Sequence, residues 1–222
     1  MADHTADRVP DGEKSPAAMR TDGRRARGER SRKAITRRAV DLASLDGLDG
    51  LSFGRLADDL GISKAGIQTL FRTKEHLQLA TIEEARLLFV DTVIRPAATV
   101  EEGAARLRAL IENWIDYAVA PLFPGGCFWT ANLAEFDSRP GPVRDALVKQ
   151  HNAWLAVLTH ELRVAAQRCD IATPEPELTA FQIQAVLSAT NIALRLSDTD
   201  SVARAHRALD ALLAPLTRQS TS

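Results

Sequence analysis

Apolar residues recur along most of this chain at the three- and four-residue spacing that gathers them on one face of an α-helix. No segment alternates apolar and polar residues in the way that a half-buried β-strand does. The pattern therefore predicts an all-α fold of about nine helices with no internal repeat. Glycine, proline and capping residues place these helices at roughly 31–45, 52–60, 63–71, 73–91, 100–118, 127–136, 140–169, 177–196 and 201–216.

Two of the predicted helices are short and are joined by a tight turn at Gly61, a residue that adopts turn conformations freely. Ser52 and Ser63 stand where these helices begin, and a serine hydroxyl there accepts a hydrogen bond from an otherwise unsatisfied backbone N–H. The apolar residues on the inner faces of the two helices are Phe53, Leu56, Ala57, Leu60, Ile67, Leu70 and Phe71. A helix-turn-helix of this kind presents its second helix to the major groove, so DNA binding is the first hypothesis.

Composition divides the chain into four parts. Residues 1–28 are polar and contain almost no large apolar residues, so they cannot bury enough surface to offset chain entropy and are predicted to be a disordered basic arm. Residues 29–76 form the predicted three-helix helix-turn-helix domain. Residues 77–216 form a larger helical bundle that shares the long fourth helix with this domain, and residues 217–222 are predicted to be a flexible tail.

The charge of the chain is unevenly distributed, although its formal net value is only −1. Residues 20–38 carry nine basic and two acidic side chains, which gives this segment a net charge of +7. Residues 1–78 have a net charge of +3 and the remainder has −4. A basic end on an acidic body is expected when only one end meets phosphates. The arginine-rich segment is either a solvated tail or an arm that contacts the DNA backbone or minor groove.

Little in the sequence indicates an enzyme, a metal site or a cofactor site. The five histidines are scattered, and the motifs HExxH, CxxC and GxSxG are absent. Cys127 and Cys169 do not suggest a disulfide framework and fit a reducing cytoplasm. No apolar run approaches the roughly 18 residues that span a bilayer, and no secretory signal is expected at the charged N-terminus. We expect a cytoplasmic protein that is not an enzyme and holds no cofactor.

The segment around the helix-turn-helix resembles the tetracycline-repressor-like (TetR) family of bacterial transcription regulators. The residues that carry the resemblance are Leu56-Ala57, Gly61-Ile62-Ser63-Lys64, Phe71, Thr73-Lys74-Glu75 and Leu77. The resemblance covers residues 31–77, and residues 124–128 are similar to a ligand-domain segment of one subgroup. It implies a homodimer that binds a near-palindromic operator in successive major grooves. It also implies a small, largely apolar effector in the C-terminal domain that releases the DNA.

The same resemblance implies roles for single residues. Those assigned to DNA binding are Ser52, Arg55, Lys64, Ala65, Gly66, Gln68, Thr69 and Lys74. Ser52, Lys64 and Lys74 fall at phosphate-contacting positions, where a lysine acts as a point charge. Gln68 stands where the family commonly has tyrosine, and it can either read adenine through two hydrogen bonds or bond a phosphate. Gly66 either allows close approach to DNA or reflects a tolerant position.

Aromatic residues concentrate between positions 114 and 154, where they either pack in the core or line a ligand pocket. The residues assigned to a pocket are Trp114, Tyr117, Phe123, Cys127, Phe128, Asn132, Phe136 and Trp154. The last two helices carry small residues among large apolar ones, which suits either a dimer interface or an internal core face. The residues assigned to the dimer interface are Phe181, Ala185, Ser188, Ala189 and Ile192.

Other functions stay open at this point. The protein could be an activator, or a regulator that has no small-molecule ligand. It could also be a helical small-molecule-binding protein or an enzyme whose DNA-binding domain is vestigial. Specific binding to a palindrome would favour the regulator, and turnover of a substrate would favour the enzyme.

Overall fold

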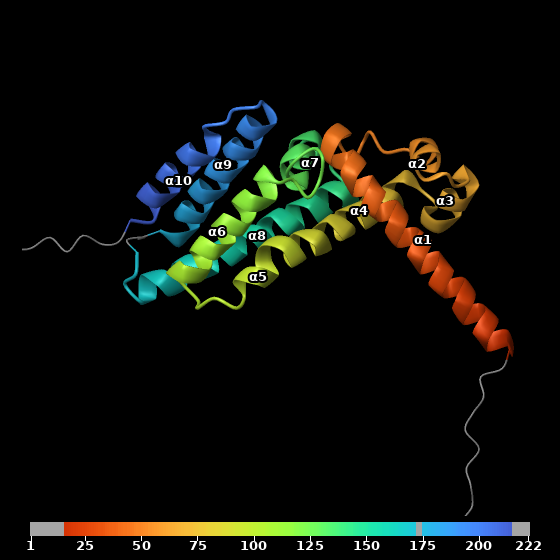
Figure 1. The fold of residues 1–222 in the computed structure, drawn as a ribbon, viewed down its shortest axis with the longest axis horizontal. Helices are drawn as coiled ribbons and strands as arrows, with labels where there is room; N and C mark the ends of the chain where they lie inside the picture. Colours follow the sequence, from red (N-terminus) through yellow and green to blue (C-terminus); the bar gives the residue numbers. More distant parts are fainter. Residues whose placement is uncertain (1–15, 172–174, 215–222) are drawn as a thin grey trace, which may run out of the picture.

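A computed structural model describes residues 16–171 and 175–214, with residues 16–25 described by their backbone alone, and every regular element in these ranges is helical (Figure 1). The N-terminal elements are α1 (Pro16–Asp46), α2 (Phe53–Leu60), α3 (Lys64–Phe71) and α4 (Lys74–Phe89). They are followed by η1 (Val90–Ile94), α5 (Arg95–Ala97), α6 (Ala104–Val119), α7 (Phe128–Phe136), α8 (Pro142–Gln167), α9 (Pro176–Arg195) and α10 (Ser201–Leu212). The all-α prediction is confirmed, and the described ranges hold nine helices when α4, η1 and α5 are counted as one.

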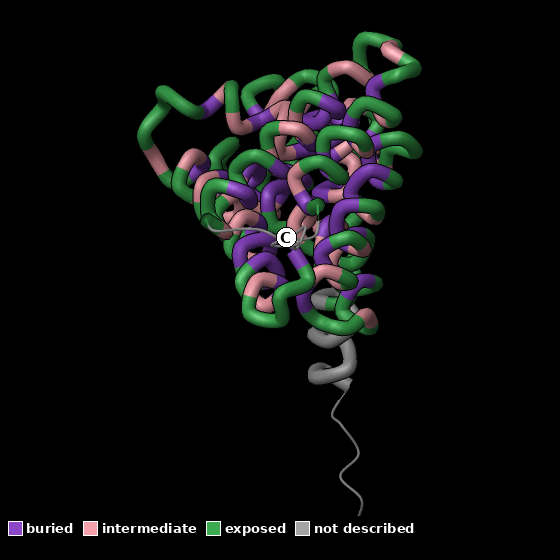
Figure 2. Tube along the Cα trace, turned by 90° about the vertical axis from the view of Figure 1, so that its left-hand side faces the viewer, coloured by how far each residue is buried: buried purple, intermediate pink, exposed green. Residues whose placement is uncertain are grey.

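The molecule is elongated, with α2 and α3 at one end and α9 and α10 at the other (Figure 1). The helix α1 packs along α4, and α8 contacts α4, α6, α7 and α9. Figure 2 shows that buried positions follow the inner sides of the helices and that exposed positions cover their outer sides. Amphipathic helices therefore bury one apolar face each, and burial of these faces provides most of their stability.

The first helix begins earlier than the sequence pattern predicts. It starts at Pro16 rather than near residue 31, so residues 16–28 are helical where a disordered arm was expected. Proline suits the first position of a helix, and the alanine, arginine and methionine residues that follow have high helix propensity. Propensity therefore continues α1 beyond its apolar stripe. Residues 1–15 of the predicted arm and the predicted tail at 217–222 lie outside the described residues.

The long fourth helix does not end before Pro96, as the sequence pattern predicts, but passes into the π-helix η1. Proline lacks an N–H and clashes with the preceding turn of a regular α-helix. The wider turn of η1 absorbs this conflict, and the N–H of Arg95 bonds to the carbonyl of Val90, five residues earlier. Asn113 of α6 donates a hydrogen bond of 3.0 Å from Nδ2 to the carbonyl oxygen of Val93. The bulge is therefore held against α6.

A buried joint connects the end of α1 to α7 and the loop before it. The side-chain oxygen of Asn132 accepts a 2.7 Å hydrogen bond from the N–H of Leu48, and its Nδ2 donates to the carbonyls of Ala43 and Phe128. The neighbouring Gly125 N–H donates to the hydroxyl of Ser44 at 3.0 Å. We call these contacts the α1–α7 joint. They fix the N-terminal helices on the body of the protein.

We expect Asn132→Ala to lower the free energy of unfolding by about 2–3 kcal/mol, because it leaves the buried N–H of Leu48 without a partner and removes two further hydrogen bonds to backbone carbonyls. Denaturation in urea, followed by circular dichroism, measures this change. Asn152→Ala, at an exposed position of α8, is the matched control and should stay within about 0.5 kcal/mol of the wild type. Equal effects of the two substitutions would contradict the role given to the joint.

Candidate DNA-binding surface and ligand cavity

The helix-turn-helix owes its local shape to three side-chain caps. The hydroxyls of Ser52, Ser63 and Thr73 each accept a 3.1 Å hydrogen bond from a backbone N–H three residues later, at the starts of α2, α3 and α4. Each cap satisfies one N–H that the helix itself leaves without a partner. Gly61 ends α2 in the left-handed conformation at φ 62°, which an L side chain rarely adopts. The turn between α2 and α3 therefore follows from local chemistry.

The helix α3 buries one face and exposes the other. Ile67 and Phe71 are almost fully buried, while the residues on the opposite side are exposed. The exposed ones are Lys64, Ala65, Gly66, Gln68 and Thr69, all of which the sequence assigned to DNA contact. The Thr69 hydroxyl donates to the carbonyl of Ala65 at 2.8 Å, which holds it against the helix. The structure therefore brings the assigned residues of α3 together on one exposed surface.

Gly66 has a structural role that sequence reasoning missed. A Cβ atom at this position would lie 3.0 Å from the Oγ of Ser63, the atom that caps α3. A larger residue would therefore press on the cap, although the Ser63 side chain could shift. Glycine at position 66 therefore leaves the capping hydroxyl of Ser63 uncrowded, and it also leaves the backbone of α3 exposed at this position.

The cationic side chains assigned to DNA contact differ in their surroundings. Lys64 forms no ion pair with any residue in the described ranges. Arg55 pairs with Asp46 at 2.6 Å, and Lys74 pairs with Asp49 at 3.0 Å. The hydrogen bond from Lys74, helped by a second one from Arg139, lowers the pKa of the Asp49 carboxyl. The ammonium group of Lys64 is therefore free to bind an anion directly. Arg55 and Lys74 would first have to release the aspartates with which they pair.

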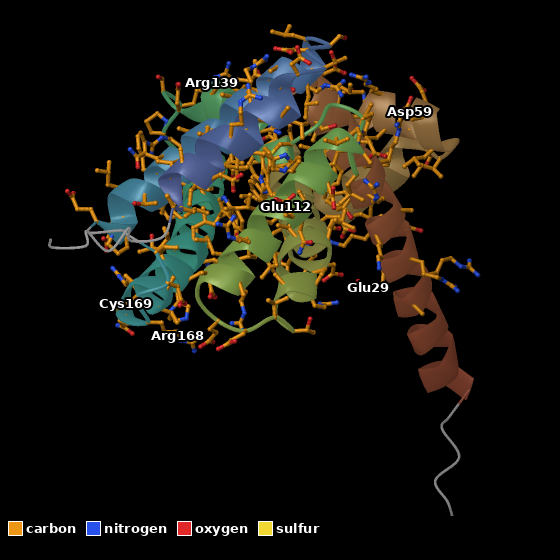
Figure 3. All side chains as sticks on the ribbon, turned by 60° about the vertical axis from the view of Figure 1, so that its left-hand side comes forward. Glu29, Asp59, Glu112, Arg139, Arg168 and Cys169 are labelled. Carbon is orange, nitrogen blue, oxygen red and sulfur yellow. The ribbon has the colours of Figure 1, made fainter. Side chains whose placement is uncertain are left out.

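Three arginines of the basic segment contact the protein itself. Arg32 stacks over the ring of Phe71 at 4.6 Å and donates to the carbonyl of Leu70. Arg37 donates to the carbonyl of Leu122 in the body, and Arg38 bonds to Asp59 of α2, a residue labelled in Figure 3. These three guanidinium groups therefore fasten α1 to its neighbours.

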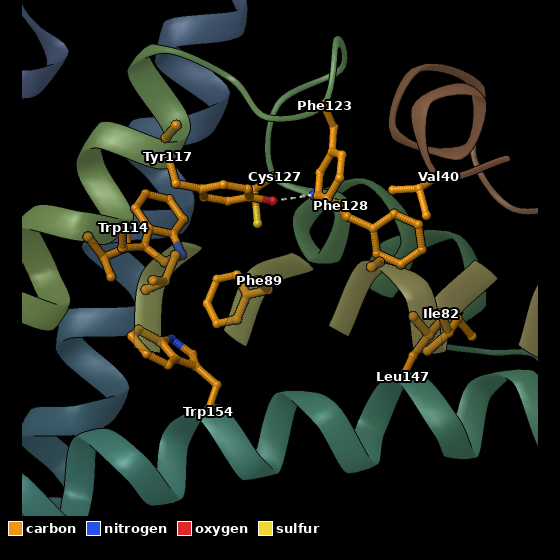
Figure 4. Close-up of a cluster of buried hydrophobic side chains, with 14 of the residues drawn as sticks. Val40, Ile82, Phe89, Trp114, Tyr117, Phe123, Cys127, Phe128, Leu147 and Trp154 are labelled. Atoms are coloured by element: carbon orange, nitrogen blue, oxygen red, sulfur yellow. Dashed lines mark hydrogen bonds between the residues drawn. The ribbon is translucent and has the colours of Figure 1, made fainter. Parts of the chain in front are cut away.

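A cavity of about 150 Å³ opens between α4, η1, α6, α7, α8 and α9. Four of its thirteen lining residues are Phe or Trp, and Figure 4 shows Phe89 beside Trp154, Trp114 and Tyr117. The ring of Phe89 meets Trp154 edge to face at 5.4 Å and Trp129 at 6.4 Å. The lining residues are Arg86, Phe89, Val90, Ile94, Trp114, Cys127, Trp129, Gln150, His151, Ala153, Trp154, Val157 and Gln184. Such an apolar pocket with a few polar groups is typical of a small-molecule site.

Only part of the pocket assigned from the sequence lines this cavity. Trp114, Cys127 and Trp154 do so, and the other five assigned residues lie elsewhere. These five are Tyr117, Phe123, Phe128, Asn132 and Phe136. Sequence reasoning also missed Phe89 and Gln184 as members of the wall, since helical spacing shows only that a residue faces inward. Which of several inward residues border a hollow depends on how the helices pack.

The five assigned residues that do not line the cavity have other structural roles. The Tyr117 hydroxyl accepts a 3.1 Å hydrogen bond from the N–H of Phe128 (Figure 4), and burial, together with the nearby Cys127 thiol, raises its pKa. The rings of Phe123 and Phe128 meet in the core, 6.3 Å apart. Asn132 belongs to the α1–α7 joint. Phe136 borders a second, more open hollow of about 370 Å³ between α7 and α8, which shares His151 with the cavity.

The polar groups of the cavity are few. The Trp154 indole N–H donates to Gln184 Oε1 at 2.7 Å, and Gln184 Nε2 donates to the hydroxyl of Ser188 at 2.8 Å. Burial lowers the pKa of His151, which favours its neutral form. Arg86 makes two short hydrogen bonds to Glu83, and these raise the pKa of its guanidinium group. Cys169, the second cysteine, lies far from the cavity at the exposed end of α8 (Figure 3).

The helix α9 carries an exposed apolar stripe on the side that faces away from the body. Phe181 is 63% exposed and Ile192 is 52% exposed. All five residues assigned to a dimer interface lie on or beside this stripe, with Ser188 half-buried at its edge. Leu178 and Leu196 extend the stripe at its two ends, which sequence reasoning missed. A surface patch of this kind marks an interaction site more often than a solvated face.

Residues 16–171 and 175–214 hold neither a cluster of metal-ligating side chains nor a helix that could span a membrane. No group of three or more His, Cys, Asp or Glu side chains is arranged so that it could hold a metal ion. No described helix combines the length and the apolar character that crossing a membrane requires.

Comparisons with known proteins agree with this geometry. The profile of a family described as "Tetracyclin repressor-like, C-terminal domain" matches residues 103–209. A TetR transcriptional regulator from Chloroflexus aurantiacus superimposes with a TM-score of 0.75, at 20% identity over 84% of this chain and 94% of that chain. No sequence among curated proteins matches this chain.

Two further solved structures share the fold. The reduced form of Escherichia coli NemR has a TM-score of 0.68, at 18% identity over 83% of this chain and 98% of that chain. AibR, in complex with isovaleryl coenzyme A and operator DNA, has a TM-score of 0.66, at 20% identity over 83% of this chain and 98% of that chain.

Proposed function

Because the chain belongs to the tetracycline-repressor-like family of transcriptional regulators, we propose that it is a ligand-responsive repressor of the bacterial cytoplasm. In this proposal it binds a palindromic operator as a homodimer and leaves the DNA when a small, largely apolar effector binds. The carrying observation is the exposed face of α3, which has both helix caps in place and an accessible lysine at its first turn.

The exposed surface of α3 has the chemistry that a major groove requires. Lys64 would neutralise a phosphate, and Gln68 would meet a base edge or a second phosphate. Ala65, Gly66 and Thr69 are small, so the helix can approach the base pairs closely. Arg55 and Lys74, with Ser52, would flank α3 as further phosphate contacts. Their ion pairs are exposed and contribute little, so exchange of aspartate for phosphate is inexpensive.

The apolar stripe of α9 supports a homodimer. Two-fold packing of this stripe against its own copy would bury Phe181 and Ile192, which a monomer leaves in water. The small residues Ala185 and Ala189 between them allow the two helices to approach closely. A two-fold dimer also matches a palindromic operator, because two copies of α3 then read two equivalent half-sites.

The fourth helix supplies a path from effector to DNA. It begins two residues after α3 ends, and its far end, with η1, forms part of the cavity wall through Phe89, Val90 and Ile94. An effector that fits the cavity best when this wall has moved would shift α4 and, with it, α3. Differential affinity for the two arrangements is what such coupling requires. AibR, described with isovaleryl coenzyme A and operator DNA, offers a precedent for a relative of this fold meeting both kinds of ligand.

We expect Lys64→Ala and Gln68→Ala to impair DNA binding in different ways. Lys64→Ala should weaken binding to all sequences and reduce the salt dependence of the logarithm of the association constant by about 1. Gln68→Ala should mainly relax sequence preference at the base pair it meets, by about 5- to 150-fold if it reads adenine. Binding to a randomised DNA library at several salt concentrations, followed by sequencing, measures both effects.

Lys149→Ala and Gln167→Ala are the matched controls for these two variants, since both residues are exposed on α8. Neither control should change affinity or preference. Wild-type protein that enriches no sequence above the non-specific background would sink the proposed function. Enrichment that both α3 variants leave untouched would place the DNA contact elsewhere.

We expect Ile192→Glu to break the homodimer, because it would place two carboxylates in an apolar interface without partners. Sedimentation equilibrium should show a dimer for the wild type and a monomer for the variant. Affinity for a two-half-site operator should fall by at least about a hundredfold, because the two contacts are no longer linked. Leu87→Glu, on the exposed side of α4, should remain dimeric. A monomeric wild type, or a dimeric Ile192→Glu, would contradict the proposed interface.

A further inference from the structure

The walls of the cavity are richer in aromatic rings than the chain as a whole. All three tryptophans of the sequence, Trp114, Trp129 and Trp154, line it together with Phe89. The rings meet edge to face, as at Phe89 and Trp154, where the interplanar angle is 89°. A cavity bordered by such rings suits another aromatic ring, since aromatic groups prefer offset-stacked and edge-to-face neighbours.

The volume of the cavity limits the size of its occupant. A dry, apolar cavity of about 150 Å³ holds a molecule of the size of benzene, and the cavity here has about that volume. A single six-membered ring with one small substituent therefore fits. The acyl chain and nucleotide of a coenzyme A thioester do not fit without a large opening of the helices.

The charges around the cavity disfavour an ionised ligand. Arg86 is the one charged residue among those that line it, and both of its short hydrogen bonds go to the carboxylate of Glu83. Glu83 already pairs with the positive charge of Arg86, so an anion in the cavity would have to share the guanidinium group with a carboxylate, and a cation would meet no lining carboxylate. Transfer of an unpaired charge into such surroundings is costly, so a neutral molecule is preferred.

Among the polar groups of the wall, the His151 ring, the Gln150 amide and the indole N–H groups of Trp114 and Trp129 have no hydrogen-bond partner in the described part of the chain, and of these only His151 and Gln150 can both donate and accept. The ring of His151 is half-buried, whereas Gln184 is engaged by Trp154 and Ser188. The lowered pKa of His151 keeps the ring neutral, with one donor and one acceptor nitrogen. The ring can therefore bond a hydroxyl or a carbonyl of a neutral ligand.

We infer that the cavity takes an uncharged, single-ring aromatic compound with one hydrogen-bonding substituent, of which phenol is the simplest case, and that His151 bonds that substituent. This inference rests on the proposed function, because it names the chemical class of the proposed effector. The inferred ligand is neutral. A cavity for carboxylates would have an unpaired arginine in its wall, and a cavity for ammonium compounds would have an unpaired acidic side chain.

Tryptophan fluorescence of the full-length protein tests the inference directly, because every tryptophan borders the cavity. Phenol, toluene, benzoate and benzylamine are titrated as probes, with N-acetyl-tryptophanamide as the control for collisional quenching. We expect saturable quenching by phenol, at least about a hundredfold weaker binding of benzoate and of protonated benzylamine, and binding of toluene about tenfold weaker than that of phenol. Benzoate or benzylamine binding as tightly as phenol, or no saturable response to phenol, would overturn it.

Two variants of α8 test separately the space for the aromatic ring and the hydrogen bond from His151. Val157→Phe fills the cavity and should abolish the phenol response. His151→Leu should remove the roughly tenfold preference for phenol over toluene, and His160→Leu, at an exposed position of the same helix, should keep it. Thermal unfolding with and without phenol gives a second readout on each variant. Retained preference in His151→Leu would exclude His151 as the partner.

A DNA-release assay distinguishes failure of this inference from failure of the proposed function. Specific DNA binding without any saturable phenol response would overturn the ligand class and leave the regulator standing. A saturable phenol response that never alters DNA binding would support the ligand class and contradict the proposed release mechanism.

Discussion

The side-chain amide of Asn132 is the contact on which the arrangement of the whole chain depends. It bonds three backbone groups. These are the carbonyl of Ala43 in the last turn of α1, the N–H of Leu48 just after α1, and the carbonyl of Phe128 in α7. Because the amide is fully buried, water does not compete for these bonds, and loss of the amide leaves the buried N–H of Leu48 unsatisfied. The joint therefore has one favourable geometry, and that geometry sets where α2 and α3 lie relative to the body.

Gly125, which is also part of the α1–α7 joint, restricts the same geometry. A Cβ atom on Gly125 would lie 1.8 Å from the carbonyl oxygen of Ser44, so only glycine allows the loop to approach α1 this closely. Two further connections start at the cavity. The helix α4 and its bulge η1 link the cavity to α3, and the hydrogen bonds from Trp154 through Gln184 to Ser188 link it to the edge of the apolar stripe of α9. The proposed effector site thus borders both the path to DNA and the proposed dimer surface.

Features that depend on local chemistry could be predicted from the sequence. The caps at Ser52, Ser63 and Thr73, the turn at Gly61 and the buried side of α3 all involve residues within one or two helical turns of each other. The family resemblance assigns five residues of α9 to a dimer interface, and the structure shows that four of them are exposed and that Ser188 is half-buried; the interface itself stays a prediction.

Features that depend on distant residues could not be predicted. Two of the three partners of Asn132 lie 84 and 89 residues away, and the partner of Lys74 lies 25 residues away. The cavity wall combines residues of α4, η1, α6, α7, α8 and α9, and spacing along one helix does not show which inward side chains leave a gap. The start of α1 was placed too late because apolar periodicity ends before helix propensity does. The π-helix compensates for Pro96 in a way that no local rule for proline anticipates.

Sequence-specific DNA binding is the central claim, and selection of fragments from genomic DNA by the purified full-length wild-type protein tests it most directly. We expect the sequenced fragments to share one palindromic motif, with half-sites separated by about one helical turn of DNA or a multiple of it, and we expect the motif to persist at physiological salt. Recovery of fragments without a shared motif, in proportion to their abundance in the library, would contradict the account.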